Sequence, residues 1–333
     1  MPPVVRRLAM IPALLAFVVT ITFVLVQLAP GDAAEVLIAP GASAEDVARL
    51  RASLQLDRPA AEQYVGTIAR LVRGDLGYSV SRGQPVREVL ADALPHSLLL
   101  GGLSLALTFV TGVTIGLWQA VRRGRPVDTA LTIVGTVIGG MPAYWLALVL
   151  VVLFTSGAAA WGWPPLLRLP AFGARDGALA ALGMAAVQDR VRHLVLPVTV
   201  LTLIGAAGIM RYARATLVRV LDDEAIRTAR AKGASEARVR WWHAVRAALP
   251  PLVVLLALAL PGVVSGSVFV EQVFAYPGMG RTMLQAIASR DVPLLLGCTV
   301  VIALVVGLST LGADLALAAL DPRQRDRAPG DGA

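Results

Sequence analysis

The sequence predicts an all-α membrane protein with six transmembrane helices. Of its 333 residues, 56% are hydrophobic and only 16% are charged. The mean hydropathy of +0.70 lies well beyond that of an ordinary soluble domain. Several apolar runs also reach the roughly 20 residues that an α-helix needs to cross about 30 Å of hydrocarbon. The predicted spans are residues 8–29, 97–120, 129–155, 194–215, 250–271 and 293–319.

The first span follows Arg6 and Arg7, a pattern shared by signal peptides and membrane anchors. Its apolar run of about 22 residues exceeds the 7 to 15 residues of a typical signal core and matches a full span. We therefore interpret residues 1–29 as a cytoplasmic N-terminus followed by the first membrane helix.

Alternating the direction of the spans places the arginine clusters on one side of the membrane. These are Arg122, Arg123 and Arg125, the loop 216–249, and Arg323, Arg325 and Arg327 in the tail 321–333. By the positive-inside rule this side is the cytoplasm, which then holds both termini. The segments 30–95, 157–193 and 272–293 fall outside. The first of them is nearly balanced in charge and predicts a small, partly helical cap, with helix starts at Ser43 and Pro59.

The third span contains the run GMPAYW, residues 140–145, after a further glycine at 139. Glycine and proline weaken the helical hydrogen-bond ladder, while Met141, Tyr144 and Trp145 offer an adaptable lining. Glu271, near the outer end of the fifth span, is a second candidate for a substrate path because charge inside a membrane is costly. A packing kink at 139–145, and snorkelling, capping or pairing of Glu271, are the structural alternatives.

A basic stretch of about forty residues, 210–251, separates the fourth and fifth spans. Asp222 or Asp223 can cap a short helix with Glu224 in its first turn, and Gly233 can end it in a left-handed turn. Ser235 can cap a second helix, from Glu236 to Pro250 and Pro251, where the next span is entered. This helix–turn–helix is suited to docking a partner. A solvated linker that only fixes topology is the alternative.

Other chemistry finds little support in the sequence. Lys232, the only lysine, follows Ala231, so no Walker-type ATP site can be built. The pair Trp241-Trp242, beside His243, fits a membrane interface better than a base-stacking site, which argues against nucleic acid. With Cys298 as the only cysteine and no HExxH or GxSxG pattern, disulfides, Cys-rich metal sites and hydrolase chemistry are disfavoured.

The run RTARAKG at 227–233 resembles the EAA-type cytoplasmic loop of binding-protein-dependent ABC importer permeases, in the peptide and nickel branch. The runs LAPGD, LDRP, RGDLG, AVRRG, YPGMGR, AIASRDVP and ALDPR, at 28–32, 56–59, 73–77, 120–124, 276–281, 286–293 and 319–323, are similar to signatures of the same family. The chain departs from the general pattern in having Arg227 at the Glu position and in its late Leu249-Pro250 pair.

The resemblance implies a type I ABC importer permease, most similar to the first permease of dipeptide and oligopeptide systems. It implies a five-helix core at 96–320 with the loop 216–249, and a location in the bacterial inner membrane. It also implies three kinds of partner besides lipid: a homologous second permease, two ATPases that hold ATP and Mg²⁺, and an extracytoplasmic solute-binding protein. The coupling residues would be Asp223, Glu224, Arg227, Thr228, Ala229, Arg230, Lys232, Gly233 and Ser235.

No cofactor is expected on this chain itself, which would import di- or oligopeptides and would not be an enzyme. A nickel or nickel-chelate permease remains an alternative. A stand-alone channel or ion-coupled carrier is a further alternative, and it predicts a chain of membrane acids that the sequence lacks.

Overall fold

The structure is a computed structural model that describes residues 3–29, 43, 45, 51–52, 57–176, 183–265 and 268–320. Six helices in this part are long and apolar enough to cross a membrane: Ala9–Leu28, Val86–Val121, Ala143–Ala160, Met184–Leu221, Glu236–Ala259 and Val292–Leu315. The predicted all-α class with six spans is confirmed. The expected helix near Ser43 falls largely on residues that are not described, and the tail 321–333 lies entirely outside them.

The chain folds into two compact units that interleave along the sequence. The first comprises residues 1–97 and 277–308, and the second comprises residues 98–276 and 309–333.

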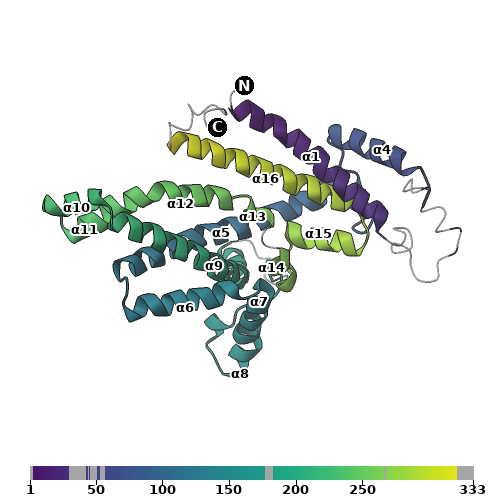
Figure 1. Cartoon of the computed structure of the whole chain (residues 1–333). Helices are drawn as coiled ribbons and strands as arrows, with labels where there is room; N and C mark the ends of the chain where they lie inside the picture. Colours follow the sequence, from purple (N-terminus) through teal and green to yellow (C-terminus); the bar gives the residue numbers. More distant parts are fainter. Residues whose placement is uncertain are drawn as a thin grey trace. The chain divides into compact units, whose positions relative to one another are not determined.

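The first unit contains α1 (Pro3–Leu28), α4 (Ala60–Val72), β1 (Tyr78–Ser79), β2 (Gln84–Pro85), α15 (Met279–Ala288) and the first parts of α5 (Val86–Val121) and α16 (Val292–Leu320). Figure 1 shows α1 beside α16, where Ile11 comes close to Gly307. Helix α4 starts directly after Pro59, as predicted, and packs on α1 through an edge-on contact of Phe23 with Tyr64 at 5.4 Å.

A buried carboxylate ties the small β1–β2 hairpin to the start of α16. Asp291 is 1% exposed, and one of its oxygens accepts hydrogen bonds from the Ser79 hydroxyl at 2.6 Å and the Ser81 hydroxyl at 2.7 Å. The other oxygen accepts the Leu294 backbone N–H at 3.1 Å. Asp291 thus caps α16 while it holds the hairpin in place.

The second unit is built around α9 (Met184–Leu221) and includes the rest of α5, α6 (Pro126–Gly140), α7 (Ala143–Val152), η1 (Leu153–Gly157), α8 (Ala158–Ala160), η2 (Pro165–Leu167), α10 (Glu224–Ala231), α11 (Glu236–Arg238), η4 (Val239–Ala244), α12 (Val245–Ala259), α13 (Gly262–Ser265) and α14 (Val268–Val273). With 36 and 38 residues, α5 and α9 are longer than the predicted spans 97–120 and 194–215. At 1.5 Å per residue both extend well beyond about 30 Å of hydrocarbon.

Glycines allow α5 and α6 to approach α9 closely. Gly112 and Gly116 lie four residues apart on α5, and a Cβ atom at either would come within 2.7 Å of Ile209 or the Met210 backbone of α9. Gly135 and Gly139 repeat this spacing on α6, where they face Met210 and Ala207. Small residues at this spacing are typical of tight helix packing in membranes.

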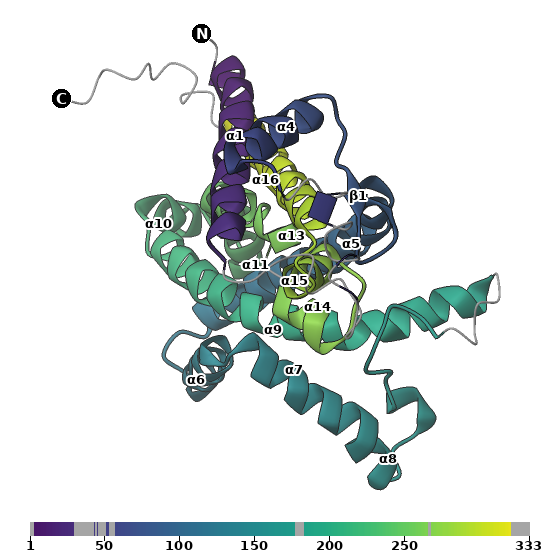
Figure 2. The same ribbon diagram turned by 90° about the vertical axis from the view of Figure 1, so that its right-hand side faces the viewer.

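The third predicted span, 129–155, is wrong as a single helix. Helix α6 ends at Gly140, Met141 and Pro142 are extended with ψ near 135°, and α7 starts at Ala143. Figures 1 and 2 together show the two helices running in different directions. The physical reason is that a residue before proline is driven out of the helical region. The expected break is present, but it separates two helices.

The fifth predicted span, 250–271, is also wrong in its bounds. A single helical run, Glu236–Ala259, contains Pro250 and Pro251 in its interior, where their missing N–H groups leave earlier carbonyls without helical partners. The run ends before Pro261, and the short helices α13 and α14 follow. The prolines expected to separate a loop helix from the span therefore lie within one continuous element.

Candidate functional site

The basic loop, which we define as residues 222–244, lies at the end of α9 and leads into α12 (Figure 1). Its first helix, α10, begins where the sequence predicts. The Asp223 side chain accepts the Ala225 backbone N–H at 2.8 Å, which satisfies one of the free donors of the first turn. Glu224 occupies that turn, where its negative charge interacts favourably with the positive end of the helix dipole.

The end of α10 is a Schellman turn at Gly233, whose φ is +82°. The Gly233 N–H donates to the Arg230 carbonyl at 2.9 Å, and the Ala234 N–H donates to the Ala229 carbonyl at 3.1 Å. Ser235 then caps α11 by accepting the Arg238 N–H at 3.4 Å. The helix–turn–helix expected from the sequence is therefore present, with the predicted residues at its caps.

A small apolar cluster fixes the two helices of the basic loop against each other. Ile226 of α10 is 3% exposed and packs with Val239 and Ala244, both fully buried, in η4. Sequence reasoning missed this contact. Ile226 is the only large apolar residue of α10, and this was the available signal.

The remaining surface of α10 is polar and exposed. Asp223, Glu224, Arg227, Thr228, Arg230, Lys232, Gly233 and Ser235 are all exposed, and Ala229 is half-buried. Arg230 pairs with Glu236 across the turn at 2.8 Å. Both side chains are substantially exposed, so solvent screens this pair and it contributes little to stability. The predicted site residues thus lie on and next to α10, and all but Ala229 are exposed.

Two ion pairs join the basic loop to the α5–α6 connection and α9 to the first turn of α6. Arg123 contacts Asp222 at 2.8 Å. Arg214 of α9 donates two hydrogen bonds of 2.7 Å to Asp128, which is 3% exposed and also accepts the Gly124 N–H. The Arg214 guanidinium holds the pKa of Asp128 below its usual value. The pair joins residues 86 apart, so sequence patterns could not reveal it.

The tryptophans that follow α11 point outward. Trp241 and Trp242 are 66% and 61% exposed, and Arg246 lies 5.6 Å from the Trp242 ring. An amphipathic ring with a nearby cation is typical of a membrane interface.

The four residues predicted for a substrate path differ in their exposure. Tyr144 and Trp145 are about half exposed on α7. Met141 packs against an apolar cluster that includes Leu146, Phe274 and Tyr276. Glu271 is fully buried in α14, which does not fit snorkelling, one of its three structural alternatives. Burial and the Glu271 charge raise the pKa of Tyr276 to about 12.

Two protein-family models match the sequence of this chain. Residues 112–326 match the binding-protein-dependent transport system inner membrane component family, and residues 3–101 match the N-terminal family of such membrane components. The chain belongs to the inner membrane component family. It is therefore a multi-pass membrane permease of the ABC importer type.

Several relatives of this inner membrane component match it over nearly its whole length. An oligopeptide transport system permease protein, AppB of Bacillus subtilis, is 33% identical over 96% of this chain and 97% of its own. A putative peptide permease of Brucella suis is 36% identical over 96% of this chain and 97% of its own. A chain of the inward-facing MetNI methionine ABC transporter has a similar fold. It has a TM-score of 0.53 at 18% identity and covers 71% of this chain and 97% of its own.

Proposed function

We propose that this chain is the pore-forming subunit of an ATP-driven importer of di- or oligopeptides. The names of its relatives, oligopeptide and peptide permease proteins, support this substrate class. In the proposed assembly a homologous second permease completes the path, two cytoplasmic ATPases supply the energy, and an extracytoplasmic binding protein delivers the peptide. ATP and Mg²⁺ bind to the ATPases, and this chain binds no cofactor.

The geometry of the basic loop carries the proposal. Its helix α10 is fixed by caps at both ends and anchored by Ile226, while its charged face remains exposed. A fixed, exposed helix suits insertion into a groove of a partner, because little conformational entropy is lost on docking. Arg227 and Lys232 on this face favour a groove with acidic or carbonyl groups. We assign the ATPase contact to this surface.

Contacts within each unit support the proposed orientation. The Arg123–Asp222 pair places the α5–α6 connection and the basic loop at the same end of the second unit. Both segments are rich in arginine, which favours the cytoplasmic side. In the first unit, Asp291 binds the β1–β2 hairpin, so these two segments share a side as well. With the spans alternating in direction, we infer that both termini are cytoplasmic and that the hairpin is external.

The test is reconstitution in proteoliposomes with a homologous second permease, two ATPases and a solute-binding protein from the same organism. We expect ATP-dependent uptake of trialanine and ATP hydrolysis that depends on the assembled complex. The chain alone should hydrolyse nothing. Uptake of nickel but not trialanine would replace the peptide assignment with the nickel one. Uptake of trialanine by this chain without the ATPases would contradict the proposal altogether.

A further inference from the structure

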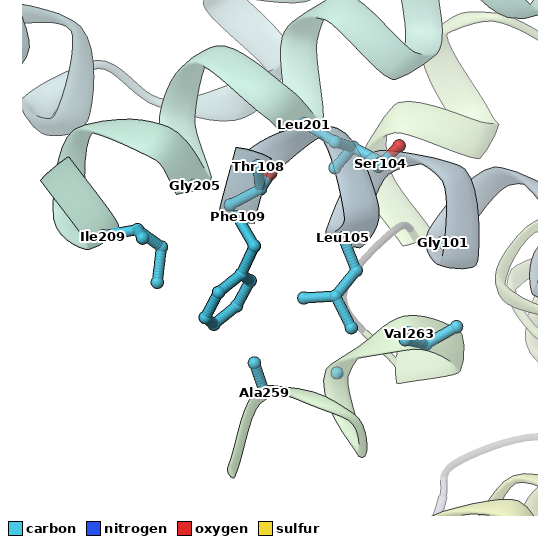
Figure 3. A pocket seen from close by; sticks show the side chains of 11 residues that line it. Gly101, Ser104, Leu105, Thr108, Phe109, Leu201, Gly205, Ile209, Ala259 and Val263 are labelled. Carbon is cyan, nitrogen blue, oxygen red and sulfur yellow. The ribbon is translucent and has the colours of Figure 1, made fainter. Parts of the chain in front are cut away.

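A pocket of about 230 Å³ opens between α5, α9 and the α12–α13 connection of the second unit (Figure 3). Leu105 and Phe109 extend from α5 toward the α12–α13 connection, where Val263 and the methyl group of Ala259 face them. Ile209 of α9 borders the same space. All the residues that line this pocket are uncharged.

Ser104 gives the apolar pocket a polar group that lacks a hydrogen-bond partner. The residue is 4% exposed, and its hydroxyl has no hydrogen-bond partner among the residues that the structure describes. Several helical hydroxyls bond back to the carbonyl four residues earlier, as Thr111 of α5 and Thr199 of α9 do at 2.6 Å. The Thr202 and Thr216 hydroxyls of α9 are buried without a partner, as that of Ser104 is, but neither residue lines the pocket. An unpaired buried hydroxyl is costly, so a ligand that the Ser104 hydroxyl could reach after a change of rotamer would give it a partner that it now lacks.

The size of the pocket suits one side chain. A dry protein cavity of about 150 Å³ can hold a benzene molecule, so this pocket admits an aromatic ring or a branched aliphatic chain. A charged side chain would lose its hydration without gaining a partner. The lining therefore selects an apolar group.

We propose that this pocket receives an apolar side chain of the imported peptide while the Ser104 hydroxyl bonds to the adjacent peptide group. The inference rests on the proposed peptide import. Ser104 has no bond to lose when it turns to another staggered rotamer toward the pocket. A lipid acyl chain would fill the space but leave the hydroxyl unpaired. The permease then contributes to selectivity in addition to the binding protein.

The first test fills the pocket by Ala259→Phe, with Leu258→Phe as the matched control. Leu258 is the preceding residue and is 69% exposed. In the reconstituted complex, Ala259→Phe should lower uptake of Ala-Phe-Ala about tenfold relative to trialanine, and Leu258→Phe should not. Equal uptake of both peptides by Ala259→Phe, or an equal loss of both, would overturn the side-chain pocket. Failure of the wild-type complex to import either peptide would refute the proposed function instead.

The second test uses Ser104→Ala, which removes the hydroxyl without removing a bond within the protein. We expect an unchanged or higher Tm and a KM for Ala-Phe-Ala raised about 3- to 10-fold, the effect of one lost hydrogen bond. A lower Tm with an unchanged KM would assign Ser104 to packing. Crosslinking to a phospholipid with a photoreactive acyl chain, and not to a photoreactive leucine tripeptide, would identify the occupant as lipid and overturn the proposal.

Discussion

Gly233→Val tests whether the Schellman turn of the basic loop couples ATP hydrolysis to transport. Gly233 has a φ of +82°, and a Cβ atom there would meet nothing within 4 Å. The cost is therefore backbone strain alone, roughly 1–2 kcal/mol for a side chain in this conformation. That reduces the population of the intact turn by a factor of about 5 to 30. Loss of the turn releases the Gly233 and Ala234 hydrogen bonds that end α10.

The assay compares membrane insertion, co-purification of the ATPases and peptide-stimulated ATP hydrolysis at matched expression. We expect normal insertion with impaired co-purification or impaired stimulation. Gly162→Val is the matched control, because Gly162 also has a positive φ, +67°, and open space around it, but lies outside the basic loop. Arg238→Lys, on the exposed face, should also have little effect. Normal coupling in Gly233→Val, or an equal loss in Gly162→Val, would refute the reasoning.

Three further predictions concern stability and topology. Ile226→Ala should cost about 2 kcal/mol or more, because the residue is buried, and should raise hydrogen exchange in α10 but not in α6. Asp128→Asn should lower Tm at neutral pH. Arg214 lowers the pKa of Asp128 in the folded state. The difference in Tm between wild type and Asp128→Asn should therefore stay constant above the unfolded pKa of about 3.9, and it should shrink as the pH falls through the lowered folded pKa. A Tm difference that stays constant to lower pH would contradict the Asp128–Arg214 pairing. In a background without Cys298, cysteines at Ala60 and Gly162 should label from outside and those at Gly124 and Gly233 only from inside. External labelling at Gly233 would overturn the orientation.

Local signals in the sequence predicted the local features of the fold. The caps at Asp223 and Ser235 and the turn at Gly233 follow from short-range rules, and the structure has each of them. The break at Met141-Pro142 follows from the same rules. Hydropathy gave the number of spans, since length and composition suffice for that, but it misplaced the bounds of the third and the fifth.

The features that the sequence could not predict depend on contacts between distant residues, or on tertiary packing that offsets a local helix breaker. Asp128 and Arg214 meet because α6 packs on α9, and no periodicity encodes that contact. Pro250 and Pro251 remain inside a helix, although proline usually ends one, because apolar packing of Ala248 and Leu252 against α5 and α9 holds the element together. Pro261, by contrast, was a local signal for the end of the span. The prediction passed over it because the apolar run continues beyond this residue.

The way α9 is held suggests how a displacement of the basic loop would spread. Close glycine contacts from α5 and α6, together with the Asp128–Arg214 pair, make these three helices difficult to move separately. The helical ladder is interrupted at Met141-Pro142 and near Pro261. Because tightly packed elements move as rigid bodies and breaks absorb the changes in φ and ψ, we expect a force on α10 to shift α5, α6 and α9 together. The pocket at Ser104 lies between that group and the α12–α13 connection, so such a shift would alter its width.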